Sequence, residues 1–158
     1  MWKVRRRQSE REAPGLAEQP RAVELPAAAG AALWWGREIF SSAEGPGDDC
    51  PPVIDLTGRP RYLLFGPYVA LPPGLWRATA FVELCPDAAK RVLAFQFGAE
   101  PDYTTVDVIR GVVGRQVVEL EHPVRSDGLA QLRLWLKKAA FHGEARFLGA
   151  SLERMGDA

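Results

Sequence analysis

The stretch from Arg59 to Leu84, RPRYLLFGPYVALPPGLWRATAFVEL, constrains the fold of this chain most strongly. Two runs of alternating residues stand on either side of a Pro-Pro-Gly corner. Alternation with a period of two is typical of strands with one buried face, and the corner predicts a tight turn between them. We therefore expect an antiparallel hairpin, with a bend or bulge at Gly66-Pro67 in its first strand. The second strand is expected to bury one face, formed by Trp76, Ala78, Ala80, Val82 and Leu84.

The same period recurs along the rest of the chain, and no convincing long helix is predicted. A short helix is the alternative for residues 33–40. A bulge is predicted at Gly149. Residues 98–103 are expected to form a loop, and Arg125 to Gly128 a turn. Further strands are predicted at 33–40, 92–97, 104–110, 115–122, 132–137 and 144–154, with a short extended piece at 53–56. Short strands separated by regular turn signals favour an all-β fold, a two-sheet antiparallel β-sandwich or a barrel. We prefer a jelly roll, in which the first and last strands lie side by side.

The domain organisation follows from length and composition. A chain of 158 residues accommodates one domain with a proper core. Residues 1–32 are rich in charge, Ala and Pro, and Pro14, Pro20 and Pro26 interrupt any helix there. We predict a disordered or loosely ordered, flexible N-terminal tail over 1–32 and a β-sandwich domain over 33–158.

Composition excludes several classes of function. Hydrophobic residues make up 47% of the chain, charged residues 25%, and the formal net charge is zero, which argues against nucleic-acid binding. No run of about 20 apolar residues predicts a membrane span. The polar N-terminal region lacks the apolar segment of a signal peptide, so we expect a cytoplasmic protein or a fragment of a longer one.

The sequence predicts no metal site and no cofactor. Cys50 and Cys85 are the only cysteines, and we expect two free thiols rather than a disulfide. The histidines, His122 and His142, stand at no ligand-like spacing from them. The acidic residues Asp48, Asp49 and Asp55 lack the regular alternation of a calcium-binding loop.

Catalytic motifs are also missing from the sequence. It contains no nucleophile elbow and no glycine-rich phosphate loop. Glu119 and Glu121 project to the same face of one predicted strand, whereas a glycosidase holds its two acids across a cleft. We therefore predict that this chain is not an enzyme.

The residues of the Pro-Pro-Gly region, besides their alternation, match a pattern found in other proteins. The segment FGPYVALPPGLWRATAFVEL resembles the pattern GPY-x-x-LPPG-x-[YW]-x-x-x-F. That pattern recurs in jelly-roll modules similar to carbohydrate-binding, galactose-binding-like β-sandwiches, including modules appended to bacterial glycosyltransferases. The residues that match are Gly66, Pro67, Tyr68, Leu71, Pro72, Pro73, Gly74, Trp76 and Phe81. Over 33–158, the resemblance implies a non-catalytic module that recognises a glycan or positions a polysaccharide-active enzyme.

Sugar recognition by such a sandwich needs an exposed aromatic ring and a few fixed polar groups. The aromatic candidates are Trp34, Trp35, Tyr62, Tyr68, Tyr103 and Trp135, with polar contacts possible from Gln96, Asp107 and Arg110. Trp76 is assigned to the core. Trp135, between Arg133 and Lys137, is either an exposed platform or packing. The predicted ligand-binding residues are Trp135, Tyr103, Asp102, Arg110 and Tyr68, of which Tyr103 and Asp102 are expected in a loop.

One alternative belongs to another class of protein. The same exposed aromatic residues and edge strands would also suit a protein-interaction or oligomerisation domain that has no sugar site. In that case the partner would be a second copy of the chain or another protein, rather than a glycan or a glycan-processing enzyme.

Overall fold

The computed structural model describes residues 32–42, 49–125 and 128–158. The predicted tail, apart from its last residue, lies outside these ranges, as do Ser126 and Asp127 of the predicted turn. The described residues form the following strands and 3₁₀ turns: β1 (Ala32–Trp35), η1 (Arg37–Ile39), β2 (Ser41–Ser42), β3 (Ile54–Asp55), β4 (Arg61–Ala70), β5 (Gly74–Leu84), η2 (Ala88–Lys90), β6 (Leu93–Ala99), β7 (Asp102–Asp107), β8 (Gly114–Val124), β9 (Leu129–Leu136) and β10 (Glu144–Gly156).

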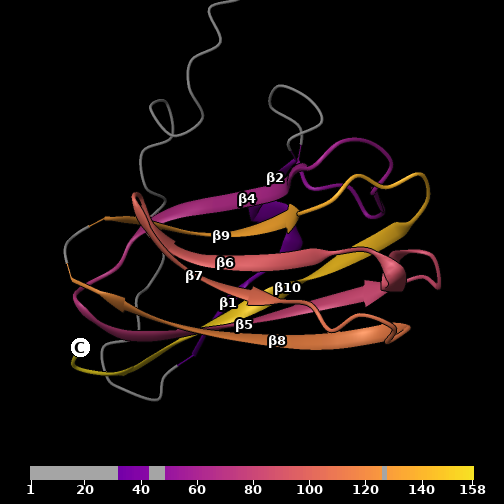
Figure 1. Cartoon of the computed structure of the whole chain (residues 1–158). Coiled ribbons are helices and arrows are strands. Elements are labelled where there is room, and N and C mark those ends of the chain that lie inside the picture. The colour runs from indigo at the N-terminus through magenta and orange to yellow at the C-terminus, as the bar shows by residue number, and fades with distance from the viewer. Residues whose placement is uncertain (1–31, 43–48, 126–127) are drawn as a thin grey trace, which may run out of the picture.

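Two antiparallel sheets pack face to face (Figure 1). Sheet A has the order β1-β10-β5-β8, and β3 pairs with the beginning of β10. Sheet B has the order β2-β4-β9-β6-β7. The first strand, β1, lies beside the last, β10, as the jelly-roll prediction required. The fold class predicted from the sequence is therefore confirmed.

The predicted hairpin between 59 and 84 is wrong in its pairing. Strand β4 pairs with β2 and β9 in sheet B, whereas β5 pairs with β10 and β8 in sheet A. The Pro72-Pro73 corner thus carries the chain from one sheet to the other, and the indole Nε1 of Trp76 donates a hydrogen bond to the Pro72 carbonyl at 2.9 Å. Consecutive prolines lack the N–H groups that a hairpin turn uses, which suits a crossing between sheets.

The single strand predicted at 33–40 is also corrected. Strand β1 ends at Trp35 in sheet A, and β2 begins at Ser41 in sheet B. The 3₁₀ turn η1 connects them, because the amides of Ile39 and Phe40 bond back to Gly36 and Arg37. The chain passes from sheet A to sheet B at η1, so the strand is interrupted at this turn.

The core lies between the sheets and follows the alternation read from the sequence. Trp76, with 0% of its surface exposed, belongs to the core as predicted, together with the other inward residues of β5. Phe147 of β10 packs edge-on against Phe40, with ring centroids 4.7 Å apart, and lies 6.1 Å from Phe95 of β6. The predicted bulges are present, as register shifts between Pro67 and Val69 and at Gly149.

Two smaller predictions concern the thiols and membrane spans. Cys50 and Cys85 are both free thiols, and burial raises the pKa of Cys50 to about 11, against the influence of Arg37. None of the helical turns in the described ranges has the length and apolar character needed to cross a membrane.

Candidate functional site

The aromatic and polar side chains that interact most densely lie on the outer face of sheet B. In β9, Leu132, Leu134 and Leu136 point into the core, so the residues between them point outward. The register places Trp135 beside Tyr62 of β4, and Arg133 beside Gln96 of β6. We call this face the platform and define it by Tyr62, Tyr68, Gln96, Tyr103, Gln131, Arg133 and Trp135.

The side-chain amide of Gln96, on β6, is hydrogen-bonded to side chains of the three strands β4, β9 and β7. Its Oε1 accepts hydrogen bonds from the Tyr62 hydroxyl at 3.1 Å and from Nη2 of Arg133 at 2.7 Å. Its Nε2 donates to the Thr105 hydroxyl on β7 at 3.1 Å. These bonds fix the orientation of the Gln96 amide and hold the neighbouring side chains in place.

A second set of bonds fixes Tyr103. Nε2 of Gln131 donates to the Tyr103 hydroxyl at 2.7 Å, and that hydroxyl lies 3.2 Å from Oε2 of Glu100, to which it donates. Burial raises the pKa of Tyr103 above its ordinary value, so the hydroxyl is a neutral donor. Gln131 is only 6% exposed and its Oε1 has no hydrogen-bond partner, which leaves an unused acceptor beside the platform.

The rings and cations of the platform are stacked. The guanidinium carbon of Arg133 lies 3.7 Å from the ring centroid of Tyr103 and 4.5 Å from that of Tyr62. The Tyr62 and Trp135 rings are 5.9 Å apart and tilted by 36°. Lys137 Nζ lies 5.6 Å from the Trp135 ring and forms a 3.1 Å ion pair with Asp107. Trp135 is half-buried, so its exposure lies between the exposed platform and the packed side chain that were the alternatives expected from the sequence.

Tyr68 reaches the platform through an unusual backbone conformation. Its φ is 63°, in the left-handed region that non-glycine residues rarely adopt. It follows the bulge at Pro67, packs edge-on against Phe65 at 6.2 Å, and interacts electrostatically with Tyr103 and Arg133. Burial raises the pKa of its hydroxyl. Such strain persists where surrounding structure holds a side chain in a required position, and it is a reason to look for function here.

The structure brings together three of the five ligand-binding residues expected from the sequence: Trp135, Tyr103 and Tyr68. Tyr103 and Asp102 belong to β7 rather than to a loop, because β6 extends to Ala99 and the turn between the strands consists of residues 100–101. Neighbours on a strand point to opposite faces, and Asp102 interacts electrostatically with the buried His122 on the inner side.

Arg110 lies away from the platform, and two residues of the platform were missing from the prediction. Arg110 follows the end of β7 and donates to the Lys90 carbonyl at 3.3 Å, beyond the end of the platform strands. Arg133 and Gln131 were not among the predicted ligand-binding residues. The signal that could have found them is the alternation of β9, which places both on the same face as Trp135.

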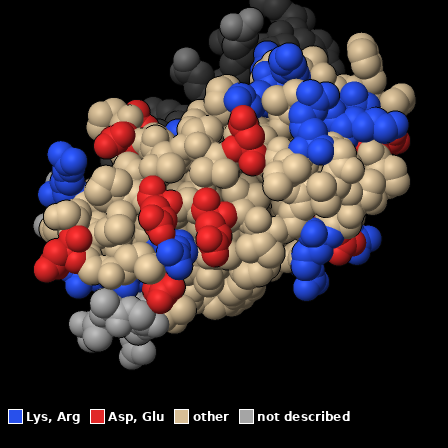
Figure 2. Space-filling view, turned by 60° about the horizontal axis from the view of Figure 1, so that its bottom comes forward, with Lys and Arg blue, Asp and Glu red and all other residues tan. Residues whose placement is uncertain are grey.

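The outer face of sheet A has a different character. Figure 2, which brings the lower side of Figure 1 forward, shows acidic groups near the middle of this side and basic groups gathered towards one end. Nε and Nη2 of Arg77 both donate to the same carboxylate oxygen of Glu121, Nη2 at 2.7 Å. Trp34, 59% exposed, packs beside Phe81 at 5.8 Å. Exposed charge of this kind mainly confers solubility.

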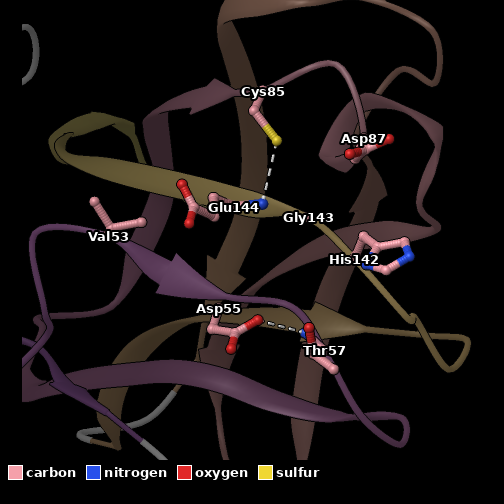
Figure 3. Close-up of a pocket in the computed structure, with 8 residues that line it drawn as sticks. All are labelled: Val53, Asp55, Thr57, Cys85, Asp87, His142, Gly143 and Glu144. Carbon is pink, nitrogen blue, oxygen red and sulfur yellow. Dashed lines mark hydrogen bonds between the residues drawn. The ribbon is translucent and has the colours of Figure 1, made fainter.

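A shallow pocket of about 610 Å³ lies at one end of the sandwich (Figure 3). The residues that line it are Val53, Asp55, Thr57, Cys85, Asp87, His142, Gly143 and Glu144. Asp55 accepts a bond from the Thr57 amide, which lowers the pKa of Asp55, and the Cys85 sulfur accepts one from the Glu144 amide at 3.2 Å. His142 shares the pocket with three carboxylates, but among the described residues none of them is hydrogen-bonded to its ring. The side chains of Asp55 and Cys85 therefore bond to the local backbone.

Comparison with known proteins gives similarities of fold. No protein-family model and no curated protein matches the chain. Among solved structures, it resembles TmCBM61 in complex with beta-1,4-galactotriose, with a TM-score of 0.49 and 14% identity over 79% of this chain and 89% of that one. It also resembles the sugar-binding EclA C-terminal domain (TM-score 0.43, 10% identity, 84% of each chain). A third is the CBM22-1 xylan-binding domain from Paenibacillus barcinonensis Xyn10C (TM-score 0.39, 14% identity, 84% of this chain and 100% of that one). At these values the likeness to carbohydrate-binding modules concerns the sandwich itself and carries no argument about function.

Proposed function

We propose that this chain is a non-catalytic carbohydrate-binding module whose platform binds a glycan. The observation that carries the proposal is the platform itself. Three tyrosines, a tryptophan, two amides and a guanidinium meet on one partly exposed sheet face, where hydrogen bonds and ring contacts hold them. Rings beside fixed polar groups are the combination that sugar recognition needs.

The binding mechanism divides the work between two kinds of group. The half-buried Trp135 ring, held at an angle by Tyr62, offers an apolar surface to the C–H groups of a pyranose. Gln96 and Arg133 supply hydrogen bonds to the hydroxyls, and the network between them lowers the entropy lost on binding because the side chains are already ordered. A module of this kind would hold an associated polysaccharide-active enzyme near its substrate, through effective concentration.

Alanine substitution on the two outer faces tests the proposal. Trp135→Ala and Tyr62→Ala should each weaken the binding of a glycan identified by array screening, by roughly tenfold or more. Trp34→Ala is the matched control, since it removes an exposed tryptophan from sheet A, and affinity should be unchanged. Isothermal titration calorimetry measures all three. Unchanged affinity in Trp135→Ala and Tyr62→Ala would contradict the proposal.

The alternative of an oligomerisation domain predicts a different result. A stable dimer that buries the platform would exclude a glycan from it, and Trp135→Ala would then shift the chain towards monomer. Light scattering coupled to size-exclusion chromatography, on the wild type and Trp135→Ala, separates the two functions. Our proposal predicts the same mass for both proteins.

A further inference from the structure

Arg133 stands at the centre of the platform without a carboxylate partner. In the described part of the chain, the ion pairs between side chains are Arg77–Glu121, Lys137–Asp107 and Arg154–Asp157. The hydrogen bond of the Arg133 side chain goes instead to the neutral amide of Gln96, and its Nε is buried and has no hydrogen-bond partner. A guanidinium carries five donors and remains charged at all relevant pH values, so most of its hydrogen-bonding capacity is unused here.

Two carboxylates beside the platform contact other groups. Glu100 accepts the hydrogen bond of the Tyr103 hydroxyl, and Asp107 is paired with Lys137 at 3.1 Å. Lys137, a cation near the platform, is therefore ion-paired, whereas Arg133 forms no ion pair within the described part of the chain. The platform thus holds, among aromatic rings, a cation that forms no ion pair with the described carboxylates.

The stacking determines which part of the guanidinium a ligand can reach. The guanidinium carbon of Arg133 lies over the rings of both Tyr103 and Tyr62, at 3.7 and 4.5 Å from their centroids, so these rings cover much of the guanidinium. What remains for a ligand is the edge formed by the two Nη groups, because Nε is buried. That edge matches the two oxygens of a carboxylate, which it binds with two parallel hydrogen bonds.

We propose that the platform selects acidic glycans, and that Arg133 binds the carboxylate of a uronic acid residue. This inference rests on the proposed function, since it names the class of glycan that the same site prefers. Trp135 would stack on the sugar ring, and the Arg133 edge would receive its carboxylate. Because a guanidinium hydrogen-bonds neutral hydroxyls less strongly than a carboxylate, removing the ligand's charge should weaken binding.

Matched pairs of ligands test the selection directly. Oligogalacturonate, oligoalginate and oligoglucuronate are compared by calorimetry with the same oligosaccharides after carboxyl reduction, which removes the charge and keeps the sugar chain. We expect the charged member of at least one pair to bind at least tenfold more tightly. Dextran sulfate and dextran serve as a further pair that reports attraction to charge alone.

Variants of the guanidinium identify the residue responsible. Arg133→Met should abolish the preference for the charged member, whereas Arg133→Lys, which keeps the charge without the fork, should retain only part of it. Arg77→Gln on sheet A changes the net charge by the same amount as Arg133→Met and should leave the preference intact. Thermal unfolding of each variant establishes that it is folded, and the wild-type comparison of ligand pairs stands without any variant.

The outcomes separate this inference from the proposed function. Equal binding of charged and carboxyl-reduced oligosaccharides would overturn the selection for acidic glycans and leave the carbohydrate-binding function in place. Equal affinity for dextran sulfate and the best uronate would show attraction to charge alone, and would also overturn it. Binding to none of the charged or neutral glycans would contradict both.

Discussion

Trp76 and Trp135 show how far single residues can be interpreted from their neighbours. Both lie on strands, but Trp76 alternates in phase with Ala78 and Ala80, whereas Trp135 alternates in phase with Arg133 and Lys137. The first is completely buried and the second lies on the outer face. The phase of alternation assigned Trp76 to the core and left Trp135 open between an exposed platform and packing, because the polarity of a strand face does not tell whether other residues cover it.

Tyr103 and Asp102 show where that reasoning failed. Their adjacency, beside Gly98 and Pro101, predicted a loop in which the two would act together. The turn is only two residues long, and the strand that follows places Tyr103 on the outer face and the exposed Asp102 on the opposite face, where it interacts with His122. Turn residues mark the presence of a turn more reliably than its length, so the assignment of neighbours to faces was lost.

His122 provides a prediction about pH at this scale. It is 4% exposed, its Nδ1 lies 3.1 Å from the Thr104 hydroxyl, and burial lowers its pKa below 6.5, although Asp102 acts in the opposite direction. The folded state therefore binds the proton more weakly than the unfolded chain does. The stability due to neutral His122 is fully present above pH 6.5 and is lost as pH falls below that value.

The measurement compares variants of the two histidines. Chemical denaturation between pH 7.5 and 5.5 should show a smaller decrease in the free energy of unfolding for His122→Gln than for the wild type. His142→Gln, at an exposed position, should behave as the wild type does. The same pH dependence in His122→Gln and the wild type would show that His122 does not contribute.

At the scale of elements, the chain passes repeatedly from one sheet to the other, and the sequence did not show where. The Pro72-Pro73 corner was taken for a hairpin turn, although β4 and β5 lie in different sheets. Both arrangements need a break in the alternation at the same residues, so the local pattern cannot distinguish them. Among the described strands of sheet B, β6 and β7, joined by residues 100–101, are the consecutive pair that forms a hairpin.

The bulge at Gly149 makes a prediction for strand β10. Gly149 has a φ of 118°, and a Cβ added there would lie 2.5 Å from the Trp34 ring and 2.9 Å from the Trp35 carbonyl oxygen. Gly149→Ala should therefore lower the free energy of unfolding through backbone strain and through a steric clash. Gly111→Ala is the control for backbone strain, because its φ is 82° and nothing lies within 4 Å of an added Cβ.

The difference between the two variants isolates the clash. We expect Gly149→Ala to cost about 1–3 kcal/mol more than Gly111→Ala in urea denaturation, which is the range for overpacking. Equal decreases in the free energy of unfolding would contradict this prediction, because β1 would then move away from the added Cβ at no cost in stability. They would also mean that the contact of Trp34 with the bulge does not stabilise the pairing of β1 with β10.

At the scale of the molecule, the platform depends on an order of strands that the sequence pattern does not predict. Tyr62, Arg133, Gln96 and Tyr103 come from β4, β9, β6 and β7, which are neighbours in sheet B although they are far apart along the chain. Alternation within 92–97 and 132–137 predicted the outward direction of Gln96 and Arg133, whereas Tyr62 was a candidate only as an aromatic residue and Tyr103 was expected in a loop. Their meeting requires the jelly-roll topology, which loop lengths alone do not fix.

The most direct test of the central claim is an NMR titration of the ¹⁵N-labelled chain with the glycan that binds most tightly among the neutral and acidic oligosaccharides. We predict that the largest amide shifts cluster on β9, β6, β7 and β4 around Arg133, while the amides of β5, β8 and β10 remain unchanged. Shifts centred on the outer face of sheet A or on the pocket around His142, or the lack of any binding, would contradict the claim that the platform is a glycan-binding site.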